Sequence, residues 1–135
     1  MSGTRYHSFD APRDRPAPRF LRGLTLDGES WTREITERTL IVAVKPDCDG
    51  CREFVEGDVH PLASLAVVVV SKTGNDDWKS HRRSVFVSPD AFTDLLIHSA
   101  PFYVLVDPET ARVVCEGSVF SAAQVAEEIA AYEES

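Results

Sequence analysis

The sequence lacks any apolar run long enough to cross a membrane, which requires roughly 18 residues. Its longest apolar run, at residues 65–70, has only the length of a strand. Positive charge is also scarce, because 14 Lys and Arg stand against 22 Asp and Glu, for a formal net charge of −8 at pH 7. Since phosphate binding needs an excess of Lys and Arg, we expect no nucleic-acid partner. The short apolar runs lead us to expect no membrane partner either.

Cysteine is rare as well. Three cysteines cannot form the disulfide framework of a small secreted domain, and one must be left over. The first thirty residues contain no apolar stretch of the kind found in a secretory signal peptide, so the chain, taken as given, is expected to be cytoplasmic. Cytoplasmic thiols are kept reduced, and a close cysteine pair there is more often catalytic or metal-binding than structural.

The size and composition are those of one ordinary domain. A chain of 135 residues, 43% of them hydrophobic, is long enough to bury a core. Residues 1–19 are rich in Pro and Arg and lack periodic apolar positions, so burial cannot offset the entropy that they would lose on ordering. We therefore expect a flexible basic tail at residues 1–19, a solvated leader rather than a docking arm. Residues 20–135 are expected to form one domain and the protein to be a monomer.

Strand and helix patterns alternate along residues 20–135. Apolar residues around Asp27-Gly28 predict an initial β-hairpin, because this pair favours a two-residue turn. Helical periodicity predicts one helix that begins at the cysteine pair and two more at residues 90–97 and 122–132, the last capped by Ser121. Alternating strands and helices indicate an α/β fold. The predicted strands lie at residues 40–44, 65–70, 85–87, 102–106 and 112–115.

A long polar segment, residues 72–84, interrupts the pattern. Loops of this length are often functional or disordered. Trp78 within it is expected to pack back on the body of the domain rather than to form part of a partner-binding rim.

The central chemical signal is a Cys-x-x-Cys motif, formed by Cys48 and Cys51, between a buried strand and a helical pattern. A thiol at a helix N-terminus lies near unpaired backbone N–H groups and the positive end of the helix dipole, which favour the thiolate. The thiolate is the attacking species in disulfide exchange, and the two-residue spacing brings the second sulfur within reach of the first. The motif predicts Cys48 as the nucleophile and Cys51 as the resolving thiol.

Metal binding is the competing interpretation of the cysteine pair. It needs further ligands, and the sequence offers only Cys115, four histidines and carboxylates, without a second Cys-x-x-Cys or a pair of histidines at ligand spacing. We therefore favour redox chemistry, with no metal and no cofactor. Cys115 is interpreted as a small, buried apolar residue of the core, and His98 as a solvent-facing residue.

The order of these elements resembles the thioredoxin superfamily: a strand, Cys-x-x-Cys at a helix start, a Val-rich strand, a helix and then the run Pro101-Phe-Tyr-Val-Leu-Val-Asp. Residues 20–30 and 85–90 are similar to segments of its redoxin, or TlpA-like, branch. The run from Pro101 also looks like the thioredoxin-like accessory protein of methylamine dehydrogenase maturation. The resemblance covers roughly residues 20–135 and implies a thioredoxin fold, a central mixed sheet flanked by helices, with an N-terminal β-hairpin extension.

The resemblance also implies a cis peptide bond between Ala100 and Pro101, facing the cysteine pair. The alternative is a simple proline at the start of a strand. Family members use the backbone just before this proline to hold an extended substrate segment by strand-like hydrogen bonds. The residues expected to line the substrate groove are Ala100, Pro101, Pro46, Asp47, Asp49 and Gly50.

The sequence departs from thioredoxin at two places. Where thioredoxins carry Trp-Cys-Gly-Pro-Cys, Asp47 and Asp49 flank Cys48 and oppose formation of a thiolate there, which predicts a more reducing couple than that of strongly oxidising members. The buried acid that thioredoxins carry six residues before the first cysteine is matched by Val42, so this proton acceptor is missing. The substitutes to consider are Glu53, Glu56, Asp58 and water.

We therefore predict a thiol–disulfide oxidoreductase that acts on the disulfide of a protein partner and is served by an unidentified electron donor. The alternative is a thioredoxin-fold binding module, for a protein or a metal, in which the cysteines are idle. A peroxidase ranks below both, because residues 45–47 do not supply the Thr that peroxiredoxins place ahead of their reactive cysteine.

Overall fold

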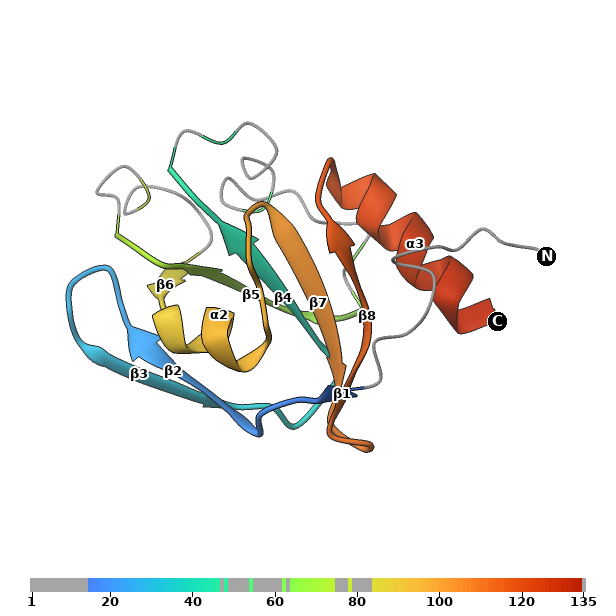
Figure 1. Cartoon of the computed structure of the whole chain (residues 1–135), viewed down its shortest axis with the longest axis horizontal. Coiled ribbons are helices and arrows are strands. Elements are labelled where there is room, and N and C mark those ends of the chain that lie inside the picture. Colours follow the sequence, from blue (N-terminus) through green and yellow to red (C-terminus); the bar gives the residue numbers. More distant parts are fainter. Residues whose placement is uncertain are drawn as a thin grey trace.

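The computed structural model describes residues 15–46, 48, 54, 62, 64–74, 78 and 84–134. In this part of the chain, strands form one sheet in the order β1-β8-β7-β4-β5-β6-β2-β3. Figure 1 shows α3 beside β8 and the β2–β3 hairpin curling beneath α2. No helix of the described part is long and apolar enough to cross a membrane. The elements are β1 (Arg15–Pro16), β2 (Phe20–Leu24), β3 (Ser30–Glu34), β4 (Thr39–Val44), β5 (Ala66–Ser71), β6 (Val85–Val87), α2 (Pro89–Asp94), β7 (Phe102–Asp107), β8 (Arg112–Ser118) and α3 (Ala122–Glu134).

The centre of the sheet is mixed, as expected. β4 pairs in parallel with β5 and antiparallel with β7, while β5 pairs in parallel with β6 and β7 antiparallel with β8. All six residues of β4 are buried, which explains why its sequence is a continuous apolar run instead of an alternating one. The predicted strands are confirmed, with ends that differ by up to three residues.

Successive residues of the central strands point to opposite faces of the sheet, and each face has its own core. We call one the α3 face, because its core includes Val125 and Ile129 of α3. We call the other the α2 face, because its core includes Phe92 of α2. From β4 and β7, the α3 face takes Leu40, Val42, Val44, Tyr103 and Leu105. The same strands give Ile41, Ala43, Val104 and Val106 to the α2 face.

The helices begin and end at identifiable signals. The Ser88 hydroxyl caps α2 by accepting the Ala91 N–H at 3.2 Å. The predicted helix 90–97 is shorter than expected: α2 ends at Asp94, and Leu96 takes a left-handed conformation with φ 57°. The predicted cap of α3 is confirmed, because the Ser121 hydroxyl accepts the Gln124 N–H at 3.0 Å.

The hairpin at Asp27-Gly28 is confirmed, but its loop is longer than two residues. Leu24 and Ser30 are the last paired residues of β2 and β3, and the Thr25 N–H donates to the Glu29 carbonyl at 2.8 Å. Gly28 has φ 88°, a left-handed conformation that glycine adopts without strain. The expectation for Trp78 is confirmed as well, since its side chain is buried in the core of the α3 face.

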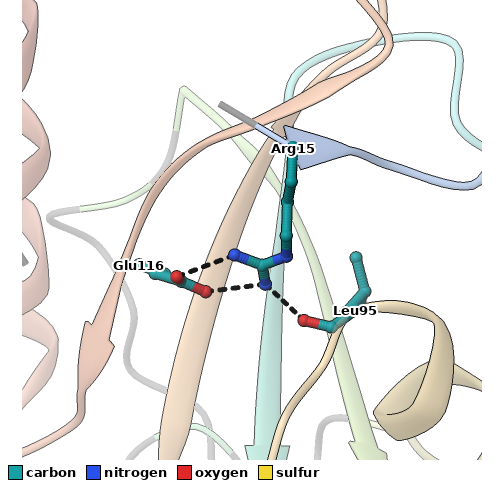
Figure 2. A network of polar contacts seen from close by, with 3 residues as sticks. All are labelled: Arg15, Leu95 and Glu116. Carbon is teal, nitrogen blue, oxygen red and sulfur yellow. Dashed lines mark hydrogen bonds and ion pairs between the residues drawn. The ribbon is translucent and has the colours of Figure 1, made fainter. Parts of the chain in front are cut away.

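The folded part of the chain begins earlier than expected, which corrects the boundary of the predicted tail. Arg15 and Pro16 form β1, which pairs antiparallel with Val113 and Arg112 of β8. The Arg15 guanidinium makes two hydrogen bonds of 2.8 Å to the buried Glu116 carboxylate and a third to the Leu95 carbonyl (Figure 2). A charge-assisted, bidentate contact therefore orders a segment that offers little apolar area for burial. Residues 1–14 lie outside the described residues.

Candidate functional site

The first predicted site residue, Cys48, lies four residues beyond the carboxyl end of β4. Its side chain is half-buried and packs against the core of the α3 face. Pro46, just before it, is half-buried too. Asp47, Asp49, Gly50 and Cys51 lie outside the described residues, as does most of the helix predicted to begin at the cysteine pair. Its one described residue, Phe54, is helical and fully buried.

The second part of the predicted site lies at the same end of the sheet. Because β7 runs antiparallel to β4, with Phe102 opposite Ala43, the start of β7 is beside the end of β4 (Figure 1). Pro101 immediately precedes β7, and the Ala100–Pro101 peptide bond is cis, the isomer that the resemblance implies. Ala100 and Pro101 are both half-buried. The structure therefore brings Pro46, Cys48, Ala100 and Pro101 to one partly exposed end of the sheet.

Val42 occupies the position at which thioredoxins carry a buried acid. It is fully buried in β4, opposite Val69 of β5 and Tyr103 of β7. An apolar environment of this kind would penalise a charged group. As predicted, this position supplies no proton acceptor, and the suggested substitutes Glu53, Glu56 and Asp58 lie outside the described residues.

Cys115 is a buried thiol on β8, as expected for a structural cysteine. It lies opposite Leu105, three positions along β7 from Phe102, and therefore away from the end of the sheet that carries Pro101. Burial raises the pKa of the Cys115 thiol, while the hydrogen bond with Tyr103, 3.5 Å between hydroxyl oxygen and sulfur, acts in the opposite direction. A buried thiol with a raised pKa is a poor nucleophile, which agrees with a structural role for Cys115.

The turn between β8 and α3, which holds none of the predicted site residues, adjoins the site. The Val119 N–H donates to the Pro101 carbonyl at 3.3 Å, so the turn between β8 and α3 lies directly beside Pro101. Gln124 fixes this turn: its side-chain oxygen accepts the N–H groups of Phe120 at 2.7 Å and Ser121 at 3.2 Å. The available signal was the spacing Ser121-x-x-Gln124, a capping box in which the third helical residue bonds back to the cap.

The remaining polar candidates do not gather into a metal site in the described part of the chain. His98 is exposed, as expected. No group of three or more His, Cys, Asp or Glu that could hold one metal ion occurs among the described residues.

No family model matches the chain, and no curated protein matches it. Solved structures do. A thiol:disulfide interchange protein of the thioredoxin family from Chlorobium tepidum has a TM-score of 0.62 and 16% identity over 89% of this chain and 97% of its own. A thiol:disulfide interchange protein from Bacteroides sp. has the same score and identity over 93% and 92%.

A secreted disulfide oxidoreductase from Mycobacterium tuberculosis is similar too, with a TM-score of 0.59 and 11% identity over 82% of this chain and 95% of that one. These similarities give no support to the likeness to the methylamine dehydrogenase accessory protein. They extend over nearly the whole of each solved structure. The chain therefore has the thioredoxin fold.

Proposed function

We propose that this protein is a thiol–disulfide oxidoreductase that exchanges disulfides with a protein partner through Cys48 and Cys51. The observation that carries the proposal is the position of Cys48, a half-buried cysteine just beyond the carboxyl end of β4 and at the same end of the sheet as Pro101. The similar structures support it, because they bear the names of disulfide interchange proteins and oxidoreductases.

In the proposed reaction, the Cys48 thiolate attacks one sulfur of the partner's disulfide. A mixed disulfide between Cys48 and the partner forms, and the other partner sulfur leaves as a thiolate that takes up a proton. The Cys51 thiolate then attacks the Cys48 sulfur, forms the Cys48–Cys51 disulfide and releases the second partner thiolate. The partner gains two electrons, this protein loses two, and a thiol donor restores the dithiol by the same exchange.

The surrounding residues have separate roles in this proposal. Ala100 and Pro101 offer backbone at the same end of the sheet as Cys48, at which an extended partner segment can form strand-like hydrogen bonds. We propose that the rest of the groove involves Pro46, Asp47, Asp49 and Gly50, as the resemblance implies. The carboxylates of Asp47 and Asp49 disfavour the Cys48 thiolate, so we propose a couple on the reducing side of the strongly oxidising members.

The test is reduction of insulin by dithiothreitol, followed as turbidity, with wild type, Cys48→Ser and Cys115→Ser. Wild type and Cys115→Ser are expected to accelerate the reaction equally, whereas Cys48→Ser is expected to leave it at the uncatalysed rate. Cys115→Ser is the matched control, because it removes a thiol from the core of the α3 face instead of from the end of the sheet.

Two results would contradict the proposal: no acceleration by wild type, or full activity of Cys48→Ser. Zinc content of the purified protein then tests the binding-module alternative. One zinc ion per chain, lost in Cys48→Ser, would favour a metal site at the cysteine pair.

A further inference from the structure

Phe120 is exposed without an evident reason in the fold. At 77% exposure it is the most exposed large hydrophobic side chain in the described part of the chain. It belongs to neither of the two cores defined by the described residues. An apolar side chain that stays in water contributes nothing through burial, so the stability of the domain does not account for a phenylalanine here.

The position of Phe120 links it to the proposed site. Ser118, two residues earlier, pairs with Phe102 at the start of β7. Val119 is buried, and its N–H donates to the Pro101 carbonyl at 3.3 Å. Phe120 is therefore one residue from the group that contacts Pro101, at the end of the sheet that also carries Cys48.

The turn that carries Phe120 is held in one conformation by Gln124. The Gln124 side chain accepts the Phe120 N–H at 2.7 Å and donates to the Ser118 carbonyl at 3.0 Å, so it spans the turn. It also donates to Glu128 at 2.8 Å. Glu128 in turn accepts the hydroxyl of the buried Tyr103 at 2.7 Å, which ties the turn to the core of the α3 face.

We propose that Phe120 is an apolar anchor for the protein partner of the exchange reaction. Its occupant is an extended partner segment that carries a bulky apolar side chain close to the reacting cysteine. This inference rests on the proposed function, because the partner segment is the one whose disulfide Cys48 attacks. A segment lying along Ala100 and Pro101 passes next to the turn that displays Phe120.

The physical basis is preorganisation. Binding to a mobile loop loses affinity to the entropy of ordering it, whereas the turn at Phe120 is ordered in advance by Gln124. Aromatic side chains, phenylalanine among them, are enriched in the cores of protein interfaces. The anchor adds a contact for the partner chain while leaving the attack of sulfur on sulfur unchanged.

The test uses two synthetic peptides, each with a single cysteine joined to glutathione in a mixed disulfide. They differ only in the residue two positions from the cysteine, which is Phe in one and Ser in the other. Reaction of the reduced full-length protein with each peptide is followed by acid quenching and chromatography. The variants are Phe120→Ser and the matched control Phe20→Ser, which removes a 38% exposed Phe from β2, near the other edge of the sheet.

Wild type is expected to react roughly tenfold faster with the Phe peptide than with the Ser peptide, the ratio expected from burying one apolar side chain. Phe120→Ser is expected to lose this preference and to keep the wild-type rate with the Ser peptide. Phe20→Ser is expected to keep both. Thermal unfolding of both variants checks that each is folded.

The two proposals fail in different ways. If Phe120→Ser keeps the tenfold preference, or if wild type has none, the anchor is overturned while reaction with both peptides still supports disulfide exchange. If wild type reacts with neither peptide, both proposals are overturned. A dimer seen by sedimentation and dissolved by Phe120→Ser would assign Phe120 to a contact between two copies and would overturn the anchor as well.

Discussion

The α3 face and the α2 face of the sheet each bury a polar side chain from the paired strands β7 and β8, but they differ in which partner is buried. On the α3 face, Tyr103 places a neutral hydroxyl in the core, and its carboxylate partner Glu128 lies half-buried on α3. On the α2 face the carboxylate itself is buried: the side chain of Glu116 is 7% exposed, and Arg15 reaches it from β1.

The contrast between the two faces shows that the charge of a buried polar group determines which partner the rest of the chain must provide for it. A neutral hydroxyl needs one hydrogen-bond acceptor, which a surface helix can provide while its carboxylate stays partly hydrated. A buried carboxylate needs an opposite charge at close range, because burial of an unpaired ion is far more costly. The α2 face therefore depends on a segment 101 residues away in the sequence, and the α3 face does not.

The largest expected effect comes from removing the buried carboxylate. Glu116→Ala leaves the Arg15 guanidinium beside the core without its partner, so we expect the free energy of unfolding to fall by about 3–5 kcal/mol. Urea denaturation followed by circular dichroism measures the loss.

The matched control replaces both ions by apolar residues, Arg15→Met together with Glu116→Leu. The Nε atom of Arg15 is buried and has no hydrogen-bond partner in the described part of the chain, so the ion pair is imperfectly satisfied. We expect the double variant to recover most of the stability lost in Glu116→Ala. A double variant as unstable as Glu116→Ala would show that the ion pair, and not an unpaired guanidinium, determines stability.

A smaller effect is expected on the α3 face. Tyr103→Phe removes one neutral hydroxyl, while Glu128 keeps its contact with Gln124 and access to water. The free energy of unfolding should fall by about 1 kcal/mol, the usual contribution of one such hydrogen bond. Measured in the same urea series, a loss as large as that of Glu116→Ala would contradict the contrast between the two faces.

The Tyr103 hydroxyl also predicts that the stabilities of wild type and Tyr103→Phe depend differently on pH in alkaline solution. Burial, followed by the hydrogen bonds with Cys115 and Glu128, raises the pKa of Tyr103 far above its ordinary value of 10.0. Because the folded state holds the proton more tightly than the unfolded state, this stabilisation is complete below about pH 10 and is lost as the pH rises further. The stability of wild type should therefore decline more steeply above pH 10 than that of Tyr103→Phe.

Cys115 contributes in the same direction, since burial raises the pKa of its thiol above 9.0. The comparison is therefore made in a Cys115→Ala background, with urea midpoints measured on either side of pH 10. If the urea midpoints of the proteins with and without the tyrosine hydroxyl fell in parallel with pH, the raised pKa of Tyr103 would not be the cause of the alkaline loss of stability.

The smallest expected effect concerns Leu96, next to the carbonyl that accepts from Arg15. Leu96 is exposed and has φ 57°, a left-handed conformation that is costly for a residue with a side chain. Leu96→Gly should raise the free energy of unfolding by about 0.5–1 kcal/mol, since glycine is favoured at this position after a helix. Thermal unfolding measures the gain, and a lower melting temperature would contradict it.

Much of the fold could be predicted because its signals are local. The apolar run of β4 indicated a strand buried on both faces, Asp27-Gly28 indicated a hairpin, and Ser121 marked the start of α3. Each signal depends on a few neighbouring residues. The ends of the elements were harder to predict from the sequence. α2 ends early, before a left-handed Leu96, although leucine does not favour that conformation.

The contacts that could not be predicted join distant parts of the sequence. Arg15 lies in a segment without apolar periodicity, and nothing near it indicates that Glu116 is its partner. The bond between Tyr103 and Glu128 depends on how α3 is placed over the sheet. At the site, the motif and the resemblance indicated Cys48 and Pro101, but the turn beside Pro101 follows from the register of β7 and β8.

The pairing of β1 with β8 also affects the order in which the domain is assembled during synthesis. On the ribosome, Arg15 is made 101 residues before Glu116. Arg15 therefore has no carboxylate partner until nearly all strands of the sheet have left the ribosome. Contacts between distant parts of a chain form late, because closing a long loop is entropically costly. β1 is therefore expected to dock among the last strands, and a nascent chain halted before β8 would leave that arginine unpaired.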